Sequence, residues 1–226
     1  MRTRPPACLP FSFASLARRE PLGAGGYHAY DRTAGRVAET IDRLDRMNAV
    51  SEIIVVGIVP ADRMRDYSHP GYEAYGRGIV QQLKPRIDTR VRRCTGPRHT
   101  AVMGSSLGGV SALYVAWQYP ELFDMAGCLS STFGVMDDQF ARIAVEPRRD
   151  IAVYLDSGWP QDNFDATHAM RDLLIARGYQ LGIDLLQFSF PEGMHHEQSW
   201  AARLHVPLQF FFGSQWSARR STGTRA

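Results

Sequence analysis

The sequence predicts an α/β fold, a three-layer sandwich in which helices cover both faces of a mostly parallel sheet. Short apolar runs alternate along the chain with segments of helical period, which is the order of an α/β architecture. The clearest strand is residues 53–59, a run that is β-branched almost throughout and stops at Pro60, as strands buried on both faces do. This run is the longest aliphatic stretch and is far shorter than the roughly 20 residues of a membrane helix, so we expect no membrane span.

The elements follow in order from apolar spacing and from the residues that end them. In the first helix Val37, Ile41 and Leu44 lie on one face, while Pro120 and Gly178 mark the ends of later helices. The helices expected from this spacing are residues 36–47, 72–83, 107–118, 164–177 and 197–212. The strands expected from apolar runs are residues 53–59, 100–103, 125–129, 151–155 and 185–190. Residues 62–71 have no period and predict a loop.

Length and composition predict one folded domain between two irregular ends. The 226 residues are enough for a core of ordinary size, and 44% hydrophobic with 22% charged residues excludes a disordered or fibrous chain. Residues 1–35 show no helical or strand period, and we expect them to be an irregular segment. Residues 36–213 are the expected domain, and the polar, basic residues 214–226 a disordered tail.

Charge, cysteines and the N-terminus limit the partners and the compartment. A net charge of +3 is too small to indicate a nucleic-acid partner. Arg2 and Arg4 precede an apolar stretch as in a signal peptide, but Pro10 interrupts it, so we expect a cytoplasmic protein and not a secreted one. The cysteines are too few and scattered for a disulfide framework or a CxxC metal site, so we expect free thiols at Cys8, Cys94 and Cys128.

A G-x-S-x-G motif stands between the second expected strand and its helix. In this context Gly104 to Gly108 predict a sharp turn that holds the Ser106 hydroxyl above the sheet, where a side chain at either glycine would clash. The amide of Leu107, at the start of the helix, would point at a developing oxyanion and gain from the helix dipole. The plain alternative is a glycine-rich turn without chemistry.

A nucleophilic serine needs a base, and two histidines follow the last strand. His195 comes directly out of the turn, so we favour it, with His196 as the alternative. A zinc site is excluded here because Trp200 stands where an H-E-x-x-H motif needs its second histidine, and we expect no metal or other cofactor.

The base in turn needs an orienting acid after the preceding strand. Asp156 touches the strand end and alternatively holds the turn, and Asp165 falls inside the next helix as a first-turn charge. Asp162 is left in the loop, with an N-cap of the helix as its plain alternative. We therefore favour Asp162.

Several segments together resemble the putative esterase family of α/β-hydrolases, which includes esterase D, enterochelin esterases, feruloyl esterases and mycolyltransferases. The resemblance runs from about residue 37 to 213 and is most specific at residues 103–109, 154–163 and 191–197. It implies an α/β-hydrolase sandwich. By position within the family's motifs it implies the triad Ser106, Asp162 and His195.

The N-terminus departs from this family. Such proteins usually open with two or three strands and a His-Asp-Gly-type loop whose amide is the second oxyanion donor, and residues 1–35 show neither. We therefore expect a sheet that lacks its N-terminal strands, with an exposed edge and one evident oxyanion donor, Leu107. A truncated or misread start of the chain is our hypothesis for this departure.

The sequence thus predicts a serine esterase that cleaves small-molecule carboxylic esters through an acyl-enzyme. Ser105, beside the nucleophile, Arg63 and Tyr67 are the predicted substrate contacts, with a solvated loop as the plain alternative for the last two. Residues 130–133, after a strand, wall the acyl pocket or form a plain turn. The alternatives are an acyltransferase with the same triad and a non-catalytic remnant of a hydrolase.

Overall fold

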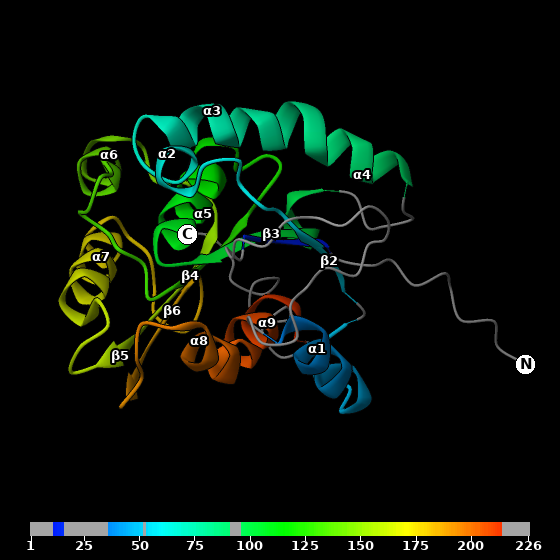
Figure 1. Cartoon of the computed structure of the whole chain (residues 1–226). Coiled ribbons are helices and arrows are strands. Elements are labelled where there is room, and N and C mark those ends of the chain that lie inside the picture. Colours follow the sequence, from blue (N-terminus) through cyan, green and yellow to red (C-terminus); the bar gives the residue numbers. More distant parts are fainter. Residues whose placement is uncertain (1–10, 16–35, 52, 91–95, 214–226) are drawn as a thin grey trace, which may run out of the picture.

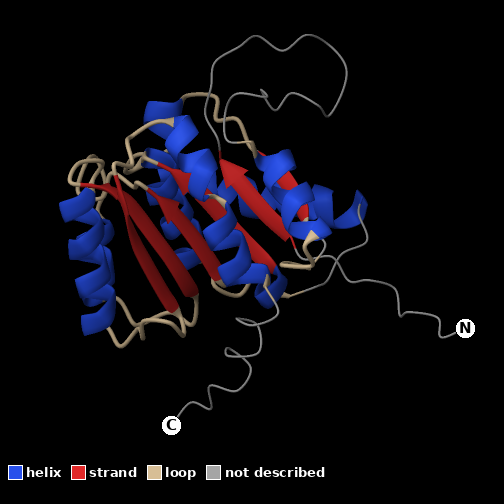
Figure 2. Ribbon diagram, turned by 90° about the horizontal axis from the view of Figure 1, so that it is seen from below, coloured by secondary structure: helices blue, strands red, loops and turns tan. Residues whose placement is uncertain are grey.

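The computed structural model describes residues 11–15, 36–51, 53–90 and 96–213. Its strands form one six-stranded parallel sheet in the order β2-β1-β3-β4-β5-β6, and Figure 2 shows their arrows running in one direction. The strands are β1 Phe11–Ser15, β2 Ile54–Gly57, β3 Thr100–Ser105, β4 Met125–Leu129, β5 Ala152–Trp159 and β6 Leu185–Pro191. The α-helices are α1 Val37–Arg46, α2 Arg63–Asp66, α3 Gly71–Gly78, α4 Lys84–Arg90, α5 Leu107–Gln118, α6 Gln139–Val145, α7 Phe164–Ala176, α8 Glu197–Arg203 and α9 His205–Phe212.

Helices cover both faces of the sheet, which confirms the predicted three-layer α/β sandwich. In Figure 1, α2 to α5 lie above the sheet and α1, α8 and α9 lie below it. Each face has its own apolar core, because successive side chains of a strand point to opposite faces. On β5, Val153 and Leu155 pack with α5 and α7, whereas Ala152 and Tyr154 pack with α8 and α9.

The N-terminal segment contains a strand that the sequence analysis did not predict. Phe11–Ser15 form β1, which pairs with β2 on one side and with β3 on the other. The expectation that residues 1–35 are irregular and that the sheet lacks all its N-terminal strands is therefore wrong at residues 11–15. β2 is the outer strand at this side of the sheet that the described residues form, and the expected exposed edge stays a prediction.

Several expected features lie outside the described residues. These are the arginines of the signal-like stretch, two of the cysteines, the remainder of the N-terminal segment and the tail: Arg2, Arg4, Cys8, Cys94, and residues 1–10, 16–35 and 214–226. Cys128 lies buried on β4 as a free thiol, as predicted. No helix in the part of the chain that the structure describes is long and apolar enough to cross a bilayer.

Most other elements agree with prediction, but two differ in extent and two short helices, α2 and α6, were not predicted. The expected loop at residues 62–71 contains the one-turn helix α2, which Asp62 caps by accepting from two backbone amides. The expected helix 72–83 begins as α3 and continues through a π-helical turn, Ile79–Leu83, into α4. The strand β5 runs to Trp159, four residues beyond the expected end. α6 was not predicted.

The expected C-terminal helix 197–212 is interrupted at Leu204. α8 ends at Arg203 and α9 begins at His205. The interruption follows from Pro207, because a proline lacks the amide for the helical hydrogen bond and its ring clashes with the carbonyl four residues earlier, here that of Arg203. Pro207 itself lies in the first turn of α9, where a proline is tolerated.

Candidate active site

The parallel sheet brings three loops to its carboxyl edge. Ser106 follows β3, Asp162 follows β5 and His195 follows β6. Parallel strands end at the same edge, and the register places these ends beside one another: Ser105 pairs with Leu129, which pairs with Asp156 on its other side. Residues far apart in the sequence therefore meet above one edge.

Ser106 lies at a tight turn between β3 and α5. Its backbone has φ 57° and ψ −130°, a sparsely populated conformation for a residue with a side chain, and its N–H donates to the Leu129 carbonyl at 2.9 Å. A Cβ on Gly104 would overlap the carbonyl of Gly108, so the close approach predicted for Gly104 is confirmed. The amide of Leu107 is the first of α5, so the helix has no carbonyl one turn earlier that could accept a hydrogen bond from it.

Ser106, His195 and Asp162 form a continuous line of hydrogen bonds. Ser106 Oγ lies 2.9 Å from His195 Nε2, and His195 Nδ1 lies 2.7 Å from Asp162 Oδ1. The Asp162 carboxylate is fully buried and the His195 ring is partly exposed, with Trp200 edge-on at 5.1 Å between centroids. With the Nδ1 proton held by Asp162, Nε2 is free to accept the serine proton.

Asp162 is held in its ionised form by the donors around it. Burial raises its pKa, but hydrogen bonds from His195, Ser130, Gly158 and Arg203 outweigh burial and leave the pKa below its ordinary value. On Oδ2 these bonds come from Ser130 Oγ at 2.6 Å, the Gly158 amide at 2.8 Å and Arg203 Nη2 at 3.1 Å. Asp162 therefore presents a permanent negative charge to His195 at neutral pH.

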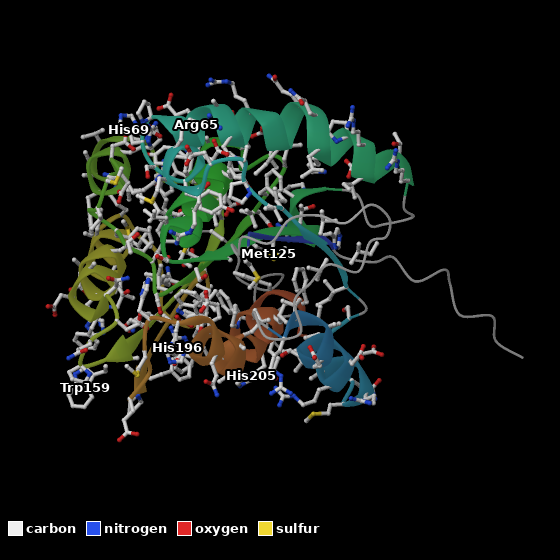
Figure 3. All side chains as sticks on the ribbon, in the orientation of Figure 1. Arg65, His69, Met125, Trp159, His196 and His205 are labelled. Atoms are coloured by element: carbon white, nitrogen blue, oxygen red, sulfur yellow. The ribbon has the colours of Figure 1, made fainter. Side chains whose placement is uncertain are left out.

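The alternative base has another structural role. His196 caps α8, because its Nδ1 accepts from the Ser199 amide at 3.2 Å. Figure 3 shows it at the lower side of the molecule, where α8 begins.

The alternative acids do not contact His195 either. Asp165 lies in the first turn of α7. Asp156 lies inside β5 and pairs with Arg203, with 3.1 Å between Oδ1 and Nε. Of the residues weighed from the sequence, the structure brings together Ser106, Asp162 and His195.

The predicted substrate contacts lie in three different environments. Ser105 ends β3 and is buried. Tyr67 is 1% exposed and packs edge-to-face on Tyr75, so it is not part of a solvated loop. Arg63 begins α2, and its neighbour Arg65 is paired with Asp66 on the upper side of the molecule in Figure 3, away from His196. Substrate contact by Ser105, Arg63 and Tyr67 stays a prediction.

Two residues of the site have contacts that the sequence did not predict. Ser130, weighed there as a pocket wall or a turn residue, donates to Asp162 and accepts from Trp200 Nε1 at 2.9 Å and from Arg203. Arg203 was not predicted at all. A signal for it exists, since Arg203 stands three residues after Trp200 and beside Leu204, on the apolar face of its helix, where a charged residue is unusual.

The described residues contain no group of three or more His, Cys, Asp or Glu side chains that could hold a metal ion. The site is instead built from a serine, a histidine and a carboxylate over the carboxyl edge of a parallel sheet.

The fold and this strand-to-helix turn define an α/β-hydrolase. Within that class the chain belongs to the esterase family whose model is described as "Putative esterase" and matches residues 26–211. Among curated proteins, the uncharacterized protein YbbA of Bacillus subtilis (strain 168) is 24% identical over 110 residues, which are 42% of this chain and 44% of that protein. The matched segment thus spans less than half of this relative.

Solved structures of esterases share the fold. A ferulic acid esterase matches with a TM-score of 0.72 at 16% identity, over 91% of this chain and 85% of that one. The enterobactin esterase FES from Shigella flexneri, in the presence of 2,3-dihydroxy-N-benzoyl-glycine, matches with a TM-score of 0.73 at 18% identity. That match covers 90% of this chain but 52% of FES. At these identities the likeness shows the fold alone.

Proposed function

We propose that the protein is a serine hydrolase that cleaves carboxylic esters through an acyl-enzyme, with Ser106 as nucleophile, His195 as base and Asp162 as orienting acid. The observation that carries the proposal is the hydrogen-bonded line from Ser106 Oγ through His195 to Asp162, at 2.9 and 2.7 Å. Membership in an esterase family supports ester hydrolysis as the reaction.

In the first half of this mechanism the serine takes the acyl group. Ser106 Oγ attacks the ester carbonyl carbon while its proton passes to His195 Nε2. The negative oxygen that forms accepts a hydrogen bond from the Leu107 amide at the start of α5. When the intermediate collapses, the bond to the alcohol oxygen breaks, and the alcohol leaves with the proton from His195.

The second half repeats these steps with water. His195 removes a proton from a water molecule, which attacks the acyl-enzyme carbonyl, and collapse releases the carboxylic acid and returns the proton to Ser106 Oγ. Asp162 keeps its charge throughout, because its donors hold its pKa below the ordinary value despite burial. Its role is to fix the tautomer of His195 and to stabilise the imidazolium.

The position of β1 bears on the second oxyanion donor. β1 ends at Ser15, whose Cα pairs with Gly104, two residues before Ser106. β1 therefore ends beside the Ser106 turn, and a second oxyanion donor would have to act at this turn. Residues 16–35 lie outside the described residues, so a single oxyanion donor stays a prediction.

The proposal is tested with Ser106→Ala and a matched control. The control is Ser51→Ala, which removes an exposed serine between α1 and β2. We expect hydrolysis of p-nitrophenyl acetate and butyrate, and labelling by a fluorophosphonate probe, by the wild type and Ser51→Ala but not by Ser106→Ala. Methyl ferulate joins the panel because one similar structure is that of a ferulic acid esterase.

Two results would contradict the proposal. Hydrolysis or labelling that persists in Ser106→Ala would exclude Ser106 as the nucleophile. A folded wild-type protein that neither turns over an ester nor reacts with the probe would favour the non-catalytic remnant.

A further inference from the structure

Asp156 carries a second carboxylate near the proposed triad, and this carboxylate does not contact His195. Its side chain is fully buried, and so is that of Asp162; the Arg203 side chain between them is 3% exposed. Arg203 Nε lies 3.1 Å from Asp156 Oδ1, and Arg203 Nη2 lies 3.1 Å from Asp162 Oδ2. One guanidinium therefore bridges two buried carboxylates.

The surrounding donors favour the ionised form of Asp156. The Tyr154 hydroxyl donates to Oδ2 at 2.8 Å, and the Ser130 amide donates to Oδ1 at 3.1 Å. Burial raises the pKa of Asp156 to about 6, while Arg203, Tyr154 and Ser130 oppose this rise. Asp156 is thus mostly ionised at neutral pH, with its charge against Arg203.

The net charge of this buried group explains why a second carboxylate is needed. Asp156, Arg203 and Asp162 together carry one negative charge, so proton transfer to His195 makes the whole group neutral. Without Asp156 the group would be neutral at rest and positive once the imidazolium forms. A buried net charge is costly in a medium of low dielectric, so the arrangement with Asp156 favours the imidazolium.

We propose that Asp156 is a positioning residue that balances the charge of Arg203, so that Asp162 keeps its full effect on His195 during catalysis. The inference rests on the proposed serine-hydrolase function. In this proposal Asp156 acts on His195 indirectly, through Arg203 and Asp162, and Asp162 remains the acid of the triad. The titratable and charged groups that face Asp156 are Tyr154 on its own strand, Cys128 on β4, Arg203 on α8, and Asp162.

Neither neutral neighbour titrates in the working range. Burial raises the pKa of Cys128, and burial with the nearby Asp156 raises that of Tyr154. Cys128 and Tyr154 therefore do not contribute to the pH response of this group near neutral pH, whereas Asp156 does.

The first test is the pH dependence of kcat/KM for Asp156→Asn, which removes the charge and keeps the shape. The acid limb reports the histidine of the free enzyme. We expect this limb to move to lower pH by about 0.5 to 1 unit and the plateau to fall roughly three- to tenfold, since one pKa unit corresponds to a factor of ten. KM should stay unchanged, because Asp156 has no contact with substrate in this proposal.

A second variant moves the limb in the opposite direction. Tyr154→Phe keeps the charge of Asp156 but removes a hydrogen bond to its ionised form. Asp156 then takes up a proton at higher pH, so kcat/KM should begin to fall at higher pH than in the wild type while the plateau stays within about twofold. This variant decides the question if Asp156→Asn does not fold.

The matched control is Asp88→Asn on α4, where the carboxylate pairs with Lys84 at 2.9 Å, at the opposite side of the molecule from α8 (Figure 1). Its profile should superimpose on that of the wild type. Acid limbs that stay in place in both Asp156→Asn and Tyr154→Phe, with activity lost evenly at all pH values, would overturn the inference. If Ser106→Ala is inactive in the same assays, this result overturns the role of Asp156 and leaves the proposed function standing.

Discussion

The tight contact between β3 and α5 predicts a large effect for Gly104→Ala. The added Cβ would overlap the carbonyl carbon and oxygen of Gly108 and lie 2.9 Å from the Gly109 nitrogen. All of these are backbone atoms at the start of α5, so no side chain can rotate to make room. Ordinary carbon contacts need about 3.5 Å, so the helix start must move by roughly 1 Å.

This displacement acts on stability and on activity. An overpacked contact of this kind costs about 1–3 kcal/mol, which corresponds to a Tm lower by roughly 3–9 °C for a chain of this size. Because Ser106 and Leu107 move with the start of α5, a shift of about 1 Å relative to His195 should lower kcat roughly 100-fold. Thermal unfolding by circular dichroism and ester hydrolysis at saturating substrate measure the two effects.

The matched control is Gly78→Ala, at the end of α3. A Cβ there meets nothing within 4 Å, and the backbone is helical at φ −61°. This variant should be more stable by about 0.5–1 kcal/mol, since alanine loses less conformational entropy in a helix, and equally active. A Gly104→Ala protein with wild-type Tm and with kcat within twofold of the wild type would refute the reasoning.

Two further predictions concern the histidines and the response to acid. His195→Ala should lower kcat by about 10⁴-fold or more, because the proposed base is lost. His196→Ala should remove only the cap of α8, which lowers the free energy of unfolding in urea by about 1 kcal/mol and leaves kcat nearly unchanged. The reverse ranking of the two kcat values would exclude His195 as the base. Because the pKa of Asp162 is lowered in the folded state, its charge stabilises the fold above its unfolded pKa of about 4, and this stabilisation is lost as the pH falls through the folded value. Calorimetry below about pH 4 should therefore show a flatter decline of Tm for Asp162→Asn than for Asp88→Asn, and equal declines would contradict the prediction.

Local patterns of residues predicted the structure most reliably. The apolar run before Gly104 and the glycine-rich turn predicted β3, the Ser106 turn and α5, because a tight strand-to-helix turn demands small residues at fixed positions. The order of strands in an α/β fold then limits the candidates for the acid to the loop after β5 and the candidates for the base to the loop after β6. The choice of Asp162 and His195 from these loops agrees with the hydrogen bonds of the structure.

β1 could not be predicted because its pairing is not local. Phe11–Ser15 is a five-residue strand that contains two serines, and its partners are residues 54–57 and 100–104. A strand this short has little preference of its own, and its place between β2 and β3 depends on segments that come later in the chain. The interruption between α8 and α9, by contrast, could have been predicted from the sequence, because Pro207 disfavours a helix that continues past Arg203, four residues earlier.

The α/β class, the turn at Ser106 and the candidates for base and acid could be predicted from residue types at short spacing. Which of the candidates meet depends on the folded arrangement of the chain. His196 is adjacent to His195, and Asp156 lies within β5, but their side chains point elsewhere: His196 caps the start of α8 and Asp156 pairs with Arg203. Direction depends on packing across the sheet edge, where β3, β5 and β6 contribute loops that are distant in sequence. The position of Arg203 between two buried carboxylates likewise follows only from the fold.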